Sequence, residues 1–208
     1  MKNGNGKSNV ISSMAQLEAL YSVPPSGQAL IKEIDHVNAA YRALIEAAPF
    51  FALATNGPEG LDCSPRGDPA GFVRVLDKKT IVIPDRRGNN RIDSLRNLIY
   101  DPRVALLFLI PGVNETLRIM GRAAISTDPK LCGSFIMQSA APRSVLMVAV
   151  DRVFFQCAKA VMRSKLWDPA SEVARSTLPT PGEILAEITN VKIDAACGAT
   201  ERRKGALY

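Results

Sequence analysis

The sequence is short of the residues that most metal sites and nucleophilic sites use. Among its 208 residues there is one histidine, His36, and the four cysteines form no CxxC pair. A zinc site of the usual kind needs several such ligands, so the sequence argues against one. A lone histidine without an evident partner also argues against catalysis by a Ser–His or Cys–His pair. We interpret the cysteines as free thiols in a reducing compartment.

Long apolar runs and aromatic residues are scarce as well. No segment approaches the ~18 apolar residues that a membrane helix needs, and the first ten residues, MKNGNGKSNV, are too polar for a secretory signal. We therefore expect a cytoplasmic protein without a membrane partner. A net charge of +6 favours anionic partners. Nucleic acid stays a minor alternative, because aromatic residues for base stacking make up only 6% of the chain.

What the sequence does contain is an ordinary globular composition, with 47% hydrophobic residues. Residues 1–11 are expected to be disordered, residues 12–190 to form one domain, and residues 191–208 to form a tail. Helices are expected in the first and last parts of the domain. Apolar spacings of three and four, with Ser or Pro at some of the starts, predict them over residues 12–21, 32–48, 157–167 and 181–189.

Short apolar runs rich in β-branched and aromatic residues fill the middle of the chain. They are bounded by Gly, Pro or Asp and joined by short connections, which favours an antiparallel barrel over alternating βαβ units. Two helices are expected to interrupt the strands, near residues 91–100 and 130–138. The predicted strands cover residues 50–55, 71–76, 80–84, 104–110, 116–126 and 144–156.

The segment PDRRGNNRIDSLRNL concentrates positive charge and free backbone N–H groups at the start of a predicted helix. Asn90 is the expected N-cap, with Asp93 three residues on as a weaker relative of the capping box. The unpaired N–H groups and the helix dipole favour an anion there, and Arg86, Arg87 and Arg91 add formal charge. This pattern indicates a phosphate site. The alternative is a capped helix with solvated arginines.

Two further arginines are expected near the same place. Arg74 lies on the predicted strand GFVRVL, and Arg66 lies in SPRGDP, upstream of it. Arginine gives bidentate, charge-assisted contacts to phosphate oxygens. Convergence of these side chains favours the phosphate site over the solvated alternative.

Taken in order, these motifs resemble a known family. FFALAT, SPRGDPAGFVRVLD, IVIPDRRGNNRIDSLRNL, DPRVALLFLIPG and TLRIMGRAAI are similar to the pyridoxamine 5′-phosphate oxidase-like flavoproteins, and within them to a subfamily of candidate FMN-dependent enzymes of unidentified substrate. The resemblance runs from about Leu17 to Trp167 and is strongest from Pro49 to Gly121. It implies a mainly β fold with flanking helices, an antiparallel FMN-binding split β-barrel. It also implies a homodimer with FMN at the subunit interface.

The resemblance further implies which residues contact FMN. By role, these are Val73, Arg74 and Val75 along the flavin, Pro84 and Asp85 at the ring or ribityl chain, Arg87, Asn90 and Arg91 at the phosphate, and Thr116 where the oxidases often carry a glutamine. Arg66, Arg74 and Lys159 are candidates to stabilise an anionic reduced flavin by their charge.

The segment CAKAVMRSKLW departs from the oxidases and is similar to the subfamily instead. On a helix over residues 157–167, Lys159, Arg163 and Trp167 would share one face, since they lie four residues apart. Such a face would cover FMN across the dimer interface. The alternative is a solvated basic face with Trp167 as a packing anchor.

The sequence thus predicts an FMN-dependent oxidoreductase that acts on an unidentified small organic substrate. The flavin would carry the hydride or electron transfer, and the protein would supply position and charge. The alternatives on the same fold are a flavin-binding protein without catalysis, and a protein that binds haem or the deazaflavin F420.

Overall fold

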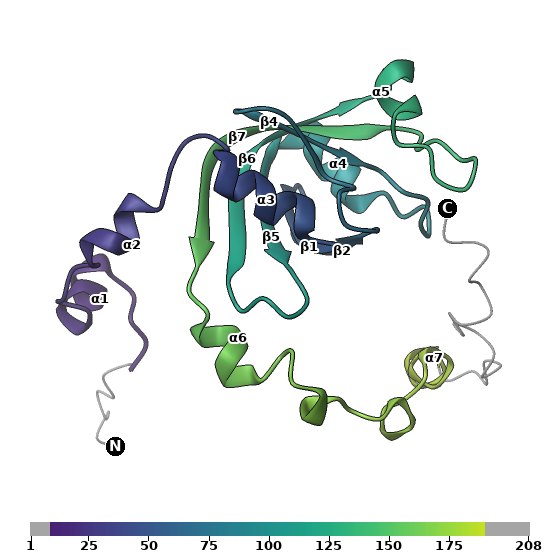
Figure 1. The fold of residues 1–208 in the computed structure, drawn as a ribbon. Coiled ribbons are helices and arrows are strands. Elements are labelled where there is room, and N and C mark those ends of the chain that lie inside the picture. Colours follow the sequence, from purple (N-terminus) through teal and green to yellow (C-terminus); the bar gives the residue numbers. More distant parts are fainter. Residues whose placement is uncertain (1–8, 190–208) are drawn as a thin grey trace. The chain divides into compact units, whose positions relative to one another are not determined.

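Seven antiparallel strands form one sheet in the order β2-β1-β5-β6-β7-β4-β3 within residues 9–189, the part of the chain that the computed structural model describes (Figure 1). Every neighbouring pair is antiparallel, and β2 and β3 are the two edges. The predicted fold class, an antiparallel split barrel with flanking helices, is confirmed. The strands are β1 (Phe50–Gly57), β2 (Gly60–Gly67), β3 (Arg74–Asp77), β4 (Thr80–Pro84), β5 (Arg103–Leu109), β6 (Thr116–Ser126) and β7 (Val145–Gln156).

Strand β2 was not predicted. It contains glycine, proline and aspartate, which strands usually avoid, yet it pairs with β1 over its whole length, with Pro65 opposite Ala52. Proline is tolerated there because β2 is an edge strand, where one missing N–H breaks no second ladder.

The described residues form seven α-helices, one more than predicted, because the short helix over residues 27–31 was not expected; several of the others differ from the prediction at their ends. Helix α3 begins at Ala39, with Asn38 as its cap, and not near Lys32. The reason is a β-bridge, in which the backbone of Ile34 exchanges hydrogen bonds with Val153 of β7. The helices are α1 (Met14–Leu20), α2 (Gly27–Ile31), α3 (Ala39–Ala47), α4 (Asp93–Tyr100), α5 (Pro129–Gly133), α6 (Lys159–Ser164) and α7 (Pro181–Thr189).

The core lies between the sheet and helix α3. Ile45 of α3 is fully buried in the same cluster as the aromatic residues of the sheet. The ring of Phe51 stacks on Phe72, with 5.8 Å between centroids, and contacts Phe108 at 4.9 Å. Close packing of this kind fixes the ends of β2 and β4, from which the site described below extends.

Strand β6 carries a register shift between Met120 and Gly121. A Cβ atom at Gly121 would lie 2.2 Å from the backbone oxygen of Ala149. Only glycine fits this close approach of β6 and β7.

The internal contacts divide the chain into two units, Met1–Glu33 and Ile34–Tyr208. In the first unit α1 begins after Ser13, whose side chain accepts a hydrogen bond from the backbone N–H of Gln16, as the predicted Ser cap requires. The expected single domain over residues 12–190 stays a prediction. Of residues 1–11, which were expected to be disordered, residues 1–8 lie outside the described residues, as does the expected tail over residues 191–208.

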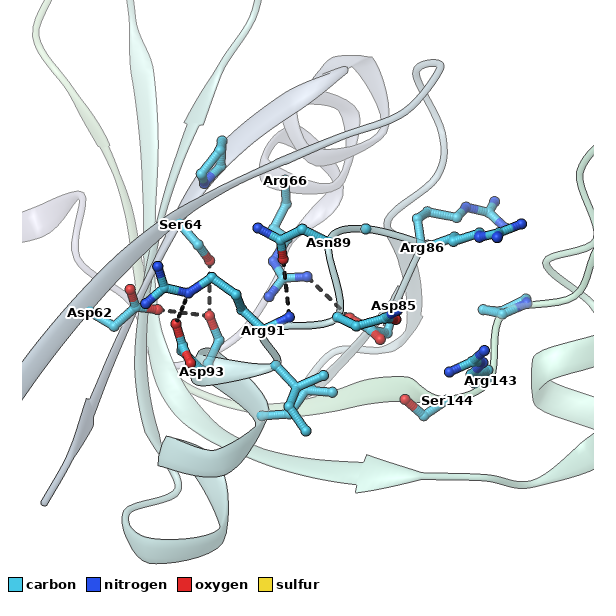
Figure 2. A pocket seen from close by; sticks show the side chains of 18 of the residues that line it. Asp62, Ser64, Arg66, Asp85, Arg86, Asn89, Arg91, Asp93, Arg143 and Ser144 are labelled. Carbon is cyan, nitrogen blue, oxygen red and sulfur yellow. Dashed lines mark hydrogen bonds and ion pairs between the residues drawn. The ribbon is translucent and has the colours of Figure 1, made fainter. Parts of the chain in front are cut away.

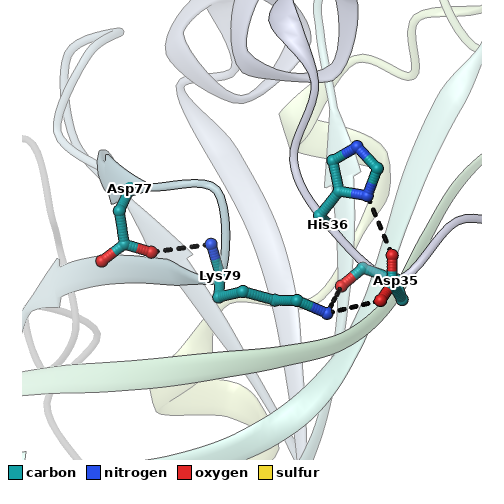
Figure 3. A network of polar contacts seen from close by, with 4 residues as sticks. All are labelled: Asp35, His36, Asp77 and Lys79. Carbon is teal, nitrogen blue, oxygen red and sulfur yellow. Dashed lines mark hydrogen bonds and ion pairs between the residues drawn. The ribbon is translucent and has the colours of Figure 1, made fainter.

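A polar network ties the start of the second unit to the turn between β3 and β4 (Figure 3). The ammonium group of Lys79 donates to the carboxylate of Asp35 at 2.7 Å, and the Nδ1 of His36 lies 2.8 Å from the same carboxylate. All three side chains are substantially exposed.

The described residues contain neither a membrane-spanning helix nor a cluster of metal ligands. Over residues 9–189 no helix is long and apolar enough to cross a membrane. The same residues bring together no group of three His, Cys, Asp or Glu side chains that could hold a metal ion.

Candidate functional site

A cavity of about 940 Å³ opens where three segments meet (Figure 2). Its walls are the inner face of β2, the loop and helix start over residues 85–95, and residues 140–144 just before β7. The volume lies within the range of sites for cofactors and small molecules. This is the place where the sequence predicted an anion site, at the end of β4.

The inner face of β2 carries a row of polar side chains. Asp62, Ser64 and Arg66 alternate along the strand and line the cavity, because side chains two residues apart point to the same face. Asp68 follows the strand and continues the alternation of half-buried residues. A strand face that packs against the core is usually apolar, so these polar side chains indicate that this face of β2 borders a cavity and not the core.

Asp62, Ser64 and Arg66 each have a hydrogen-bond partner on the segment over residues 85–95. The hydroxyl of Ser94, on α4, donates to the carboxylate of Asp62 at 2.8 Å and lies 2.9 Å from the hydroxyl of Ser64. Arg66 donates to the carboxylate of Asp85 at 3.1 Å. Sequence reasoning missed Asp62, Ser64 and Ser94, although the alternation of polar residues in LDCSPRGD was a signal for them.

The loop before α4 differs from the predicted capped start. The helix begins at Asp93, and Ile92 occupies the cap position without a side-chain hydrogen bond, so the prediction of Asn90 as the cap is wrong. Asn90 and Ile92 both have left-handed backbones, with φ of 61° and 52°. A β-branched residue in this region is strained, and strain of this kind clusters at ligand sites.

Several of the predicted cationic groups are already engaged. Arg91 pairs with Asp93 at 2.8 Å. Arg86 pairs with Asp68 and donates to the backbone oxygen of Phe135 at 2.6 Å. Both side chains therefore have their charge offset within the protein.

Arg74 does not line the large cavity. Its guanidinium donates to the hydroxyl and the backbone oxygen of Ser134, at 2.8 and 2.6 Å, and lies 4.0 Å from the ring centroid of Phe135. The predicted convergence of Arg74 on the phosphate loop is therefore wrong in this arrangement, because the α5 end offers it acceptors and an aromatic face. Arg74 lines a separate cavity of about 130 Å³ instead.

Two arginines of the large cavity stay unpaired. Arg87 and Arg143 are exposed at its wall, and within residues 9–189 neither has a carboxylate partner or a hydrogen bond. Arg143 lies at the opposite end of the view from Asp62 and Ser64 (Figure 2). Sequence reasoning had not selected Arg143, since it is distant from the phosphate loop in the sequence and only the fold brings it there.

The donor set fits FMN. The two unpaired guanidiniums suit a phosphate, and the polar row on β2 suits a chain of hydroxyl groups. The buried Nε of Arg66 has no acceptor among the described residues, and an unsatisfied buried donor is costly. The same guanidinium lines the cavity, so its other N–H groups are donors for a ligand oxygen.

Other residues that the resemblance implied lie outside this cavity. Val73, Val75 and Pro84 have buried side chains, so a contact of theirs with a ligand would have to use the backbone. Thr116 begins β6 and pairs with Gln156 of β7. None of these four side chains lines the cavity.

The helix predicted over residues 157–167 is shorter in the structure, so Lys159, Arg163 and Trp167 do not share one helical face. Helix α6 ends at Ser164, because Lys165 turns the chain with a left-handed φ of 51°. The indole N–H of Trp167 donates to the backbone oxygen of Val113 at 2.8 Å. This contact agrees with the alternative, in which Trp167 anchors the segment by packing.

The described cysteines are free thiols, and none of them lines the large cavity. Cys63 points to the exposed face of β2, Cys157 is also exposed and Cys132 is buried. Cys197 lies outside the described residues.

The sequence profile of the pyridoxamine 5′-phosphate oxidase family matches residues 37–157, more than half of the chain. No curated protein matches the chain in sequence. Among solved structures, HupZ from Group A Streptococcus is 20% identical, with a TM-score of 0.46, over 57% of this chain and 93% of HupZ. A candidate pyridoxamine 5′-phosphate oxidase from Lactobacillus delbrueckii is 16% identical, with a TM-score of 0.44, over 58% and 99%.

The General Stress Protein 26 of Bacillus anthracis is 17% identical, with a TM-score of 0.40, over 54% of this chain and 88% of its own. These likenesses to solved structures are weak. The family match spans the strands and the cavity walls, from Val37 in front of α3 to Cys157 after β7. The predicted resemblance is thereby confirmed, and the chain belongs to the pyridoxamine 5′-phosphate oxidase family.

Proposed function

We propose that the protein is an FMN-dependent oxidoreductase that acts on a small organic substrate. The observation that carries the proposal is the cavity itself, which combines two unpaired arginines with a hydrogen-bonding row on β2. Membership of the family supports the choice of FMN among phosphate-bearing ligands. Bound FMN would supply the hydride or electron transfer.

The residues of this chain would bind and orient the cofactor. Arg87 and Arg143 would hold the phosphate, and the strained loop with Asn90 would lie beside it. Arg66 would direct N–H groups into the cavity, held in position by Asp85, which offsets part of its charge. Hydrogen-bond donors fixed in a partly enclosed site favour negative charge that develops on a ligand during reduction.

A homodimer is part of the proposal. Lys159 and Arg163 are exposed on α6 and do not line the cavity of their own chain. Their contribution to FMN, as the resemblance implies, would require a second copy. Light scattering of the flavin-bound protein tests this part, and a monomer with flavin bound would contradict it.

The first experiment is an absorption spectrum of the purified protein, before and after addition of FMN and desalting. We expect a flavin spectrum that survives desalting at close to one FMN per chain. A protein that takes up no FMN would refute the proposal and lead to the same titration with F420 and haem.

A second measurement separates an enzyme from a binding protein. The flavin-loaded protein is mixed without oxygen with NADH, NADPH or dithionite, and bleaching of the flavin is followed before air is readmitted. Bleaching by a nicotinamide, with recovery in air, supports an oxidoreductase. Retained FMN that only dithionite reduces would favour a flavin-binding protein without turnover.

A further inference from the structure

Ser64 is the member of the β2 row that the proposed function leaves without a role. Its side chain lines the cavity and is half-buried, between Asp62 and Arg66 on the same face. It has one hydrogen-bond partner among the described residues, the hydroxyl of Ser94. The direction of that bond decides what Ser64 offers to a ligand.

The direction follows from the hydrogens available. An ionised carboxylate only accepts hydrogen bonds, and a hydroxyl has one hydrogen to donate. Ser94 donates its hydrogen to Asp62 at 2.8 Å, so the 2.9 Å contact between the two serines must be a donation from Ser64 to Ser94. Ser94 is only 3% exposed, so water has little access to compete for these bonds.

Ser64 therefore presents lone pairs alone to the cavity. A phosphate or carboxylate oxygen placed there would face another acceptor, which is unfavourable. A ligand hydroxyl, by contrast, would donate to Ser64 and complete a chain of bonds that ends on the Asp62 carboxylate. Bonds in such a chain polarise one another in the same direction.

The next residue on this face offers the opposite property. Arg66 lies two positions along β2, roughly 6.6 Å away along the strand, and its guanidinium, which lines the cavity, offers only N–H donors. An acceptor and a donor group thus follow each other on the cavity wall. A chain of hydroxyl groups matches both, because each hydroxyl donates one hydrogen bond and accepts others.

We propose that Ser64 is a binding residue for a polyhydroxyl chain, and that it accepts a hydrogen bond from a ribityl hydroxyl of the flavin. The inference rests on the proposed function, since the hydroxyl chain is that of FMN. It assigns two parts of the cavity to two parts of FMN. The phosphate would lie at Arg143 and Arg87, and the hydroxyl chain would lie along β2.

The test compares three flavins that share the ring system. FMN has the ribityl chain and the phosphate, riboflavin has the chain alone, and lumiflavin has neither. Dissociation constants are measured by quenching of flavin fluorescence. Ser64→Ala is expected to weaken FMN and riboflavin about fivefold each and to leave lumiflavin unchanged.

Two variants serve as controls. Cys63→Ala changes the neighbouring residue on the exposed face of β2 and is expected to bind all three flavins as the unaltered protein does. Ser64→Thr keeps the hydroxyl and suits a strand, so it is expected to restore most of the lost affinity for FMN and riboflavin.

The outcomes separate this inference from the function on which it rests. If the unaltered protein binds none of the flavins, both are overturned. If it binds FMN and Ser64→Ala binds FMN equally well, only the role of Ser64 is overturned. An equal loss for lumiflavin would also overturn it, since the effect would then not depend on the hydroxyl chain.

Discussion

The Asp68–Arg86 pair and the Asp35–Lys79 pair join similar groups in different surroundings. Beside the cavity, the side chains of Asp68 and Arg86 are 1% and 16% exposed. At the turn between β3 and β4, the side chains of Asp35 and Lys79 are 72% and 54% exposed (Figure 3). Both contacts are short, at 2.5 and 2.7 Å.

The difference between the two regions shows that exposure to water, more than contact distance, decides what an ion pair contributes. In water an attraction between charges is weak and is screened by salt. Away from water the attraction is stronger, and a charge left without its partner is costly. By its low exposure and its carboxylate partner, Arg86 is expected to stabilise the fold. The exposed Arg87 and Arg143 are the arginines that we propose bind a ligand.

The largest effect is expected from the buried pair. Asp68→Ala leaves the Arg86 guanidinium largely enclosed with its carboxylate removed, and such a loss costs about 3–5 kcal/mol of unfolding free energy. Arg86 also holds the backbone oxygen of Phe135, so the segment after α5 would loosen as well. Urea denaturation followed by circular dichroism measures the change.

The control for this prediction removes both charges. Asp68→Ala combined with Arg86→Met replaces the pair by apolar groups, and we expect part of the stability to return, because no uncompensated charge is then buried. If Asp68→Ala lowers the free energy of unfolding by less than about 1 kcal/mol, this pair contributes no more than an exposed ion pair does. The contrast between the two regions would then be wrong.

The next largest effect concerns the unpaired arginines. Arg143→Ala is expected to weaken FMN by about 10- to 100-fold, the value of a charge-assisted hydrogen bond to phosphate. Riboflavin, which lacks the phosphate, should bind as before. Fluorescence titration with both flavins measures the difference.

Arg74→Ala is the matched control, because Arg74 is bound to Ser134 and lines the other cavity. It removes the same charge from the protein without touching the large cavity. Equal losses of FMN affinity for the two variants would mean that Arg143 acts through overall charge and not through contact with the phosphate.

A smaller effect is expected from Arg91, whose side chain is 75% exposed and whose charge is offset by Asp93. Because interactions of such an exposed charge are worth less than about 1 kcal/mol, Arg91→Ala should weaken FMN by no more than about fivefold. A loss as large as that of Arg143→Ala, in the same titration, would show that Arg91 leaves Asp93 and binds the phosphate itself.

Much of the fold was predictable because local pattern and tertiary structure agree. The runs TIVIP and VALLFLI are β-branched or apolar throughout and form β4 and β5 as expected. Strand β2 was not predictable in this way, because an edge strand needs only one partner and tolerates Pro65 and Gly67. Helix α3 begins late because the pairing of Ile34 with Val153 overrides the helical spacing before Asn38.

The cavity was predictable in place but only partly in the residues that line it. The cationic loop after β4 does line the cavity. An arginine is paired or unpaired according to partners that are distant in the sequence. Arg86 forms an ion pair with Asp68, and Arg74 donates a hydrogen bond to Ser134, only in the folded chain. Local sequence carries no signal for such pairings, and Arg143 could not be selected before the fold brought residues 140–144 to the cavity.

The smallest effect is expected at the exposed network. Hydrogen bonds from Lys79 and His36 lower the pKa of Asp35 from 3.8 to about 2, so the network stabilises the fold above pH 4 and this stabilisation is lost as the pH falls toward 2. Lys79→Ala removes the largest cause of that shift. Its urea midpoint should therefore lie slightly below that of the unaltered protein at pH 5, and the difference should shrink steadily between pH 4 and pH 2. A difference in urea midpoint that stays constant between pH 4 and pH 2 would show that the Asp35 carboxylate is not its cause. A difference at pH 5 as large as that of Asp68→Ala would show that this exposed network contributes as much as the buried pair.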